Sequence, residues 1–152
     1  LEISRLFLNF ERNALTKAFL TGLCQTTETK EIKDFFHRVR HMCEKHMDIV
    51  GAEFKKEDLP IPMSLDSEVT DSTENVFSDK LAMFYVVGLN QLAVAVNGIT
   101  LSRVMRRDIL LTITRLMTEI GNCAEDGLNI MIENRWFERI PENINRNELI
   151  GV

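Results

Sequence analysis

Apolar side chains recur every three or four residues in four long stretches of the chain, and this spacing places them on one face of an α-helix. The first two stretches cover residues 3–24 and 28–56, and the last two cover residues 76–100 and 104–134. In the second and fourth stretches, charged residues occupy the opposite face, as in the surface helices of a bundle. The pattern therefore predicts four helices that pack together through their apolar faces.

The third stretch differs from the others because it carries no charged side chain from Leu81 to Leu101. A run of this length could cross a membrane, but amides and glycines interrupt it and the neighbouring stretches are amphipathic. We therefore interpret it as the central helix of a bundle and expect no membrane span. A helix that is apolar on more than one side needs more cover than one bundle gives, which favours either a homodimer through this helix or cover by the preceding loop.

A long connection separates the second and third helices, because Pro60 and Pro62 end the helical pattern and residues 57–75 are largely polar. Extended, it spans roughly 60 Å, whereas the second helix is about 42 Å long, so the loop can run back along the bundle. With short links elsewhere, this is the connectivity of ferritin-like bundles, in which the second and third helices are parallel. We predict an all-α, four-helix ferritin-like bundle with a long crossover between helices 2 and 3, in one domain over residues 1–152 with a tail at 136–152.

Polar residues at the predicted helix starts can cap the free backbone N–H groups there. Residues 25–29 offer several threonine oxygens for the second helix, and Asn75 or Ser78 can cap the third. Pro141 is expected to end regular structure after the fourth helix, ahead of the polar tail.

Composition narrows the classes of function. The chain has 152 residues, 45% hydrophobic and 27% charged, which suits one globular domain. The net charge is −5 and no Lys/Arg block is long enough to follow a phosphate backbone, so nucleic acid is not an expected partner. The three cysteines form no CxxC pair and no signal peptide is visible, which favours free thiols in a reducing compartment such as the cytoplasm.

A di-metal carboxylate site is the first chemistry to consider in such a bundle. It needs a Glu from each of two helices and a Glu-x-x-His from each of the other two. Here Cys43 lies three residues before His46, where a Glu would be required, and the third helix offers only amides such as Asn90 and Asn97. The sequence therefore lacks most of the ligands that a di-metal site would need.

A site for a single metal ion remains as an alternative, built from Glu11, Cys43 and His46, because Glu11 and His46 project from apolar stripes where an unpaired polar group is costly. We favour another interpretation, in which His46 stays neutral and bonds Asn97, Asn90 or Glu11. Such a layer of satisfied polar groups would set the register of the helices. On this interpretation we predict no catalytic residue and no cofactor.

Three short segments resemble an uncharacterised ferritin-like family found in endospore-forming bacteria. They are EFKKEDLPIP at residues 53–62, KHM at residues 45–47 and VFSD at residues 76–79. The resemblance extends over essentially the whole chain, and it implies the ferritin-like fold. Some members are described as spore coat proteins by similarity to a ferritin-like coat family, which implies a structural or packing role and transfers no catalytic residue.

These observations lead to two hypotheses of function. The first is a non-enzymatic ferritin-like structural protein, associated with the spore coat, that self-associates through its third helix and contacts other coat proteins. It would reside in the cytoplasm or on the spore. The alternative is a helical bundle that binds a metal or small ligand at a degenerate site unlike a di-iron centre.

Overall fold

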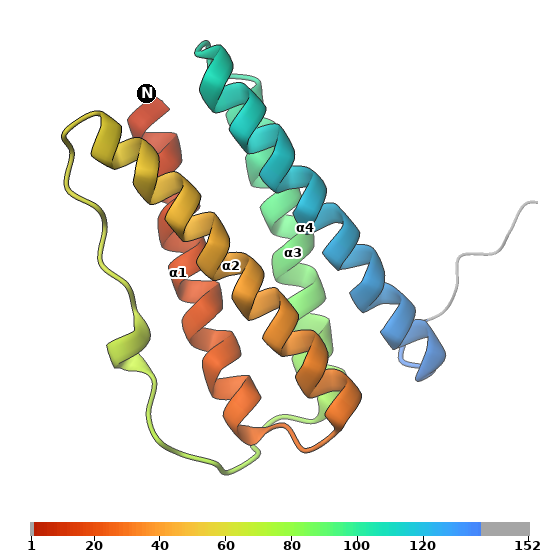
Figure 1. Cartoon of the computed structure of the whole chain (residues 1–152). Helices are drawn as coiled ribbons and strands as arrows, with labels where there is room; N and C mark the ends of the chain where they lie inside the picture. Colours follow the sequence, from red (N-terminus) through yellow and green to blue (C-terminus); the bar gives the residue numbers. More distant parts are fainter. Residues whose placement is uncertain (1, 138–152) are drawn as a thin grey trace, which may run out of the picture.

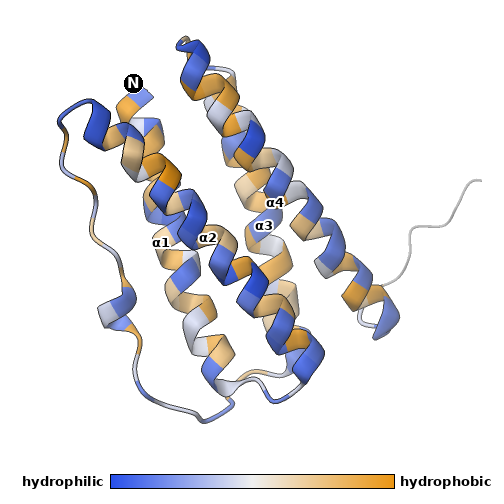
Figure 2. Cartoon of the chain, viewed as in Figure 1, coloured by the Kyte–Doolittle hydropathy of each residue, from blue (hydrophilic) through white to orange (hydrophobic). Residues whose placement is uncertain are grey.

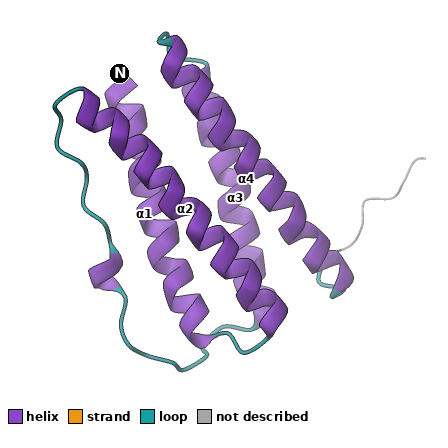
Figure 3. Ribbon diagram, viewed as in Figure 1, coloured by secondary structure: helices purple, strands orange, loops and turns teal. Residues whose placement is uncertain are grey.

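The computed structural model describes residues 2–137. This part of the chain consists of helices and loops and contains no strand (Figure 3). The elements, in chain order, are α1 (Glu2–Thr26), α2 (Lys30–Lys56), the short 3₁₀ helix η1 (Asp66–Glu68), α3 (Asp79–Leu101) and α4 (Arg107–Glu133).

The four helices form two antiparallel hairpins, α1 with α2 and α3 with α4 (Figure 1). Short connections join the helices within each hairpin, whereas residues 57–78 connect the two hairpins. This long loop returns the chain to the end at which α2 began, so α2 and α3 run parallel. The predicted all-α, four-helix fold with a long crossover between helices 2 and 3 is confirmed.

Two predicted helix starts shift for local reasons. Helix α3 begins at Asp79 because Ser78 is its N-cap, and the Ser78 hydroxyl accepts a hydrogen bond from the backbone N–H of Leu81 at 3.3 Å. Thr29 is the N-cap residue of α2, but its hydroxyl makes no cap hydrogen bond and instead donates to the carboxylate of Asp79. This contact joins the starts of the two parallel helices.

The crossover follows the outside of the α1–α2 hairpin and leaves most of α3 uncovered (Figure 1). Lys17 of α1 anchors it, with Nζ 2.9 Å from Oδ2 of Asp66 and 3.6 Å from Oε1 of Glu44. Near the end of the loop, just before α3, Phe77 packs edge-on against Phe19, with ring centroids 6.4 Å apart. The loop therefore covers α1 and reaches only the beginning of α3.

The interior contains two apolar clusters, one towards each end of the bundle. The end with the α1–α2 turn buries thirteen residues, with Phe35, Phe36 and Met83 among the largest. The other end is built around the residues Phe10, Val50, Phe54, Ile109, Ile113 and Leu116. Gly127 permits the close approach of α4 to α2 and α3, because a Cβ there would lie 2.7 Å from Phe35 and 2.8 Å from Val87.

The hydropathy of the helices differs as the sequence pattern predicts. Helices α2 and α4 mix hydrophilic and hydrophobic residues, whereas α3 is mostly hydrophobic (Figure 2). By length and composition α3 could cross a membrane, and 39% of its most apolar window is buried within the described bundle. A core helix of a soluble protein meets the same criterion, and the absence of a membrane span stays a prediction. The predicted stop at Pro141 and the tail after Phe137 lie outside the described residues.

Candidate functional site

Buried or partly buried polar and ionisable side chains occur on all four helices. The set comprises Asn9, Arg12 and Asn13 of α1, Cys43 and His46 of α2, Asn90 and Asn97 of α3, and Glu119 and Cys123 of α4. Because unpaired polar groups are costly in an apolar interior, the partners of each group determine what this region can do.

A chain of amides links α1 to α3. The Asn9 side chain donates from Nδ2 to Oδ1 of Asn97 at 2.7 Å. Asn13, one turn along α1, donates to the side-chain oxygen of Asn9 at 3.0 Å and to its backbone oxygen at 2.8 Å. Asn97 is fully buried, and its own Nδ2 has no hydrogen-bond partner among the described residues.

A charged cluster links α2 to α4. Nε2 of His46 lies 3.1 Å from Oε2 of Glu119, and the same carboxylate accepts hydrogen bonds from Lys45 at 3.0 Å and Arg115 at 3.2 Å. Since a carboxylate only accepts, Nε2 of His46 carries the hydrogen and donates it. The other ring nitrogen of His46, Nδ1, is buried and has no partner in the described structure.

Burial controls the titration of this cluster. Burial lowers the pKa of His46 and outweighs the hydrogen bond to Glu119, so the imidazole is neutral at neutral pH. Burial raises the pKa of Glu119, but the hydrogen bonds from Lys45, His46 and Arg115 prevail and lower it to about 2. The pair is therefore a neutral imidazole that donates to an ionised carboxylate.

The thiols of the buried Cys43 and the partly buried Cys123 are held in their unreactive form. Burial raises the pKa of Cys43 to about 12 and that of Cys123 to about 11. The only polar contact of Cys123 among the described residues is a weak one at 4.0 Å from Nδ2 of Asn90. A thiol with such a pKa is protonated at neutral pH, so both side chains act as small core residues.

Arg12 is the exceptional member of the interior set. Its Nε and Nη2 atoms are buried without a hydrogen-bond partner, and no carboxylate of the described residues forms an ion pair with it. Burial lowers the pKa of Arg12, although a guanidinium remains charged in proteins. Its charge reaches Cys43 and His46, in both cases as a smaller influence on their pKa than burial.

The interior does not fit a di-metal centre. Within residues 2–137, no three His, Cys, Asp or Glu side chains gather where they could hold a metal ion. Glu11 is only partly buried, whereas Cys43 and His46 are buried, so the structure does not bring the three candidate ligands together as a set. The guanidinium of Arg12 would also repel a cation bound nearby.

The partner of His46 differs from those considered in the sequence. It is Glu119 of α4 rather than Asn97, Asn90 or Glu11, because Glu119 lies at the edge of the apolar stripe of α4 and its side chain, 28% exposed, reaches inward to α2. Sequence reasoning also missed the amides and the arginine of α1. Their spacing of three and four residues, at positions 9, 12 and 13, was the signal for a polar stripe on one side of that helix.

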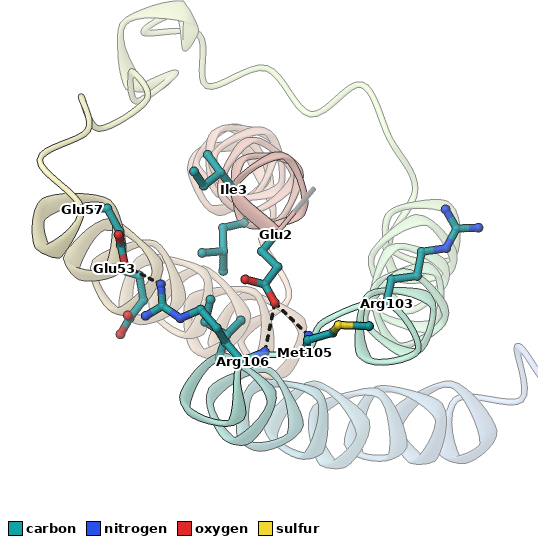
Figure 4. A pocket seen from close by; sticks show the side chains of 9 residues that line it. Glu2, Ile3, Glu53, Glu57, Arg103, Met105 and Arg106 are labelled. Carbon is teal, nitrogen blue, oxygen red and sulfur yellow. Dashed lines mark hydrogen bonds and ion pairs between the residues drawn. The ribbon is translucent and has the colours of Figure 1, made fainter.

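A separate pocket of about 620 Å³ lies at the end of the bundle where α1 begins (Figure 4). It is lined by Glu2, Ile3, Leu6, Glu53, Glu57, Arg103, Met105, Arg106 and Ile109. The carboxylate of Glu2 accepts hydrogen bonds from the backbone N–H groups of Met105 at 2.8 Å and Arg106 at 3.0 Å. Arg106 also pairs with Glu57 and, at 2.7 Å, with Asp108. These contacts tie the start of α1 and the end of α2 to the start of α4.

The outer side of α3 exposes a row of uncharged residues. Leu81, Tyr85, Gly88, Leu92, Ala95 and Ile99 are all exposed, and we call this set the α3 seam. Next to it, a groove of about 380 Å³ runs between α1 and α3, lined by Leu15, Thr16, Phe19, Phe77, Tyr85 and Leu89.

Comparison with known proteins supports the fold and the family. The chain matches the crystal structure of "a putative spore coat protein" from Bacillus halodurans C-125 with a TM-score of 0.81 and 9% identity, over 95% of this chain and 94% of that one. Identity this low shows a shared fold alone, and the fold is the ferritin-like bundle predicted above. No curated protein matches the sequence. The model of a family described as "Protein of unknown function (DUF3231)" matches residues 1–149, so the resemblance is confirmed and the chain belongs to the DUF3231 family.

Proposed function

We propose that this protein is a non-catalytic structural component of the spore coat that acts by self-association through the α3 seam. The observation that carries the proposal is the seam itself. Its residues are separated by four, three, four, three and four positions, and none of them is charged. This spacing is the repeat by which one helix packs against another in a coiled coil.

The exposure of the seam supports a second copy of the chain as its partner. Leu81, Tyr85, Leu92 and Ile99 are between 43% and 55% exposed. Gly88 and Ala95 lie between them and leave room for close approach of a second helix. Monomeric proteins rarely expose a continuous apolar surface of this kind, which is typical of interaction sites. A second copy of the chain offers the same uncharged seam, so two copies could pack seam to seam.

The interior supports a structural role over a catalytic one. The thiols of Cys43 and Cys123 are protonated at neutral pH, and His46 is closed off from solvent. A general base or nucleophile must reach its substrate, and none of these groups does so in the described bundle. The fold shared with the Bacillus halodurans protein supports a place in the spore coat by analogy.

The oligomeric state tests the interface. Leu92→Glu places a charge in the centre of the seam and should convert a dimer to a monomer, because two buried carboxylates would face each other. The matched control is Leu111→Glu on α4, since Leu111 is 60% exposed and Leu92 is 55% exposed. Light scattering after size-exclusion chromatography measures the mass of each. A native protein that is monomeric over a wide concentration range would rule out the proposed interface.

The location of the protein in sporulating cells tests its assignment to the spore coat. A fluorescent fusion of the native chain should form a shell around the developing spore in sporulating cells, and Leu92→Glu should remain diffuse while Leu111→Glu behaves as the native protein. A native fusion that stays diffuse in the mother cell throughout sporulation would argue against a coat role, even if the purified protein dimerises.

A further inference from the structure

Four buried nitrogen atoms, on side chains of α1, α2 and α3, have no hydrogen-bond partner in the described structure. They are Nε and Nη2 of Arg12, Nδ1 of His46 and Nδ2 of Asn97. His46 and Asn97 are fully buried. Native proteins leave few such groups unpaired, and a bound water or ion is one way in which such groups are satisfied.

The three side chains come from different helices but belong to one region. Arg12 and Asn9 are three residues apart and share one side of α1. Asn9 donates to Asn97 of α3 at 2.7 Å, so the amide of Asn97 lies about one helical turn from Arg12. From α2, His46 is close enough for the charge of Arg12 to affect it. The three side chains therefore lie where α1 and α2 of one hairpin meet α3 of the other.

The charge of Arg12 decides which occupant fits. Water can satisfy N–H donors, but it leaves the charge of the partly buried guanidinium uncompensated, which is costly. The carboxylate of the polar set, Glu119, is already engaged by Lys45, His46 and Arg115. The free Nε–Nη2 edge of a guanidinium presents two parallel donors, which match two oxygens of a carboxylate or phosphate.

We propose that the unpaired donors of Arg12 and Asn97 bind a small oxyanion of the phosphate or carboxylate type where α1, α2 and α3 meet, held by the guanidinium of Arg12 and the amide of Asn97. A hydroxyl on the anion, as in hydrogen phosphate, would donate to the free Nδ1 of neutral His46. The site goes beyond the proposed coat function and does not depend on it, because it lies inside the bundle rather than on the α3 seam.

Calorimetric titration of the full chain with inorganic phosphate, and separately with acetate, tests the site at constant ionic strength in chloride. We expect saturable binding of one anion per chain, with phosphate the stronger of the two if His46 accepts a hydrogen bond from it. Arg12→Met should weaken binding by about tenfold or more, because it removes two charge-assisted hydrogen bonds. Arg107→Met removes an exposed arginine of α4 and should leave binding unchanged.

Thermal unfolding gives a second measurement that does not depend on the titration. Phosphate should raise the melting temperature of the native protein beyond the effect of chloride at the same ionic strength, and it should not raise that of Arg12→Met. Arg12→Lys keeps the positive charge but lacks the two parallel N–H donors of the guanidinium. Its affinity for phosphate should therefore lie between those of the native protein and Arg12→Met. If Arg12→Met fails to fold, Arg12→Lys compared with Arg107→Met decides the question.

A crystal grown with selenate would locate the anion by its anomalous signal between Arg12 and Asn97. The absence of saturable binding to the native protein would overturn the proposal. So would equal weakening by Arg12→Met and Arg107→Met, or a selenate found only on the surface, since each of these would show an adventitious ion only.

Discussion

At the scale of single residues, the interior is arranged by contacts that join the two hairpins. His46 of α2 and Glu119 of α4 form one such contact, and Asn9 of α1 with Asn97 of α3 forms another. Each pairs a buried polar group with a partner from the opposite hairpin. Because a buried polar group without its partner is costly, these contacts favour one arrangement of the hairpins over others.

Acid should destabilise the protein in two steps. The folded state holds the pKa of His46 below its ordinary value of 6.5 and that of Glu119 at about 2, below 4.5. The unfolded chain therefore binds more protons as the pH falls, first on the histidine below pH 6.5 and then on the carboxyl between 4.5 and about 2. Both contributions to stability are complete above pH 6.5.

Denaturant unfolding above pH 6.5, between pH 6.5 and 4.5, and below pH 4.5 measures this loss of stability. Glu119→Gln should remove the contribution of Glu119 to the lower step, because the amide does not titrate. Stability that stays constant from above pH 6.5 to below 4.5 would contradict the assignment of these two groups.

Gly127 should tolerate no side chain. A Cβ at this position would lie 2.7 Å from the ring of Phe35 and 2.8 Å from a methyl of Val87, so Gly127→Ala should lower the free energy of unfolding by about 1–3 kcal/mol through overpacking. At Gly121 on the same helix, an added methyl group would have no atom within 4 Å, and Gly121→Ala should stabilise the helix by roughly 0.5–1 kcal/mol. Denaturant titration of both variants gives the comparison, and equal effects would show that α4 is not packed as described.

At the scale of elements, the crossover and α3 have opposite relations to the bundle. The loop is tied to α1 by Lys17, which is only 8% exposed although it is charged. Helix α3, by contrast, leaves an uncharged seam in contact with solvent. The polar crossover is therefore anchored to the bundle, whereas the apolar helix α3 is left partly uncovered.

Removal of the anchor should release the loop without melting the helices. Lys17→Met breaks the contacts with Asp66 and Glu44, and the helix content measured by circular dichroism should remain unchanged. Limited proteolysis within residues 57–78 should become several-fold faster, because loop cleavage requires local release from the bundle. Lys80→Met, an exposed lysine of α3, serves as the control. Equal cleavage rates for the native chain and Lys17→Met would show that the ion pair does not hold the loop.

At the scale of the whole molecule, the chain is two hairpins that meet across a polar middle and expose one apolar side. Apolar clusters at both ends supply most of the burial, whereas the middle contains amides, a neutral histidine and an arginine. The proposed dimer would use the outer surface of the second hairpin, and the proposed anion would lie between the hairpins. The two proposals therefore concern separate parts of the molecule and can fail independently.

The sequence by itself determined the local features of this protein. Periodicity identified four helices, the prolines at 60 and 62 identified the crossover, and loop length identified the parallel arrangement of α2 and α3. These features depend on residues close together in the chain, so a local pattern contains the information. The burial of His46 was also visible as a polar residue in an apolar stripe.

Only the tertiary structure decided which residues meet. The pairing of His46 with Glu119 and the burial of Arg12 depend on how far each helix is rotated and shifted against its neighbours. Periodicity is insensitive to these small shifts, since a side chain at the edge of a stripe can turn towards solvent or towards the next helix. For the same reason the sequence raised the question of what covers α3, and the path of the loop along α1 showed that the crossover leaves the α3 seam open.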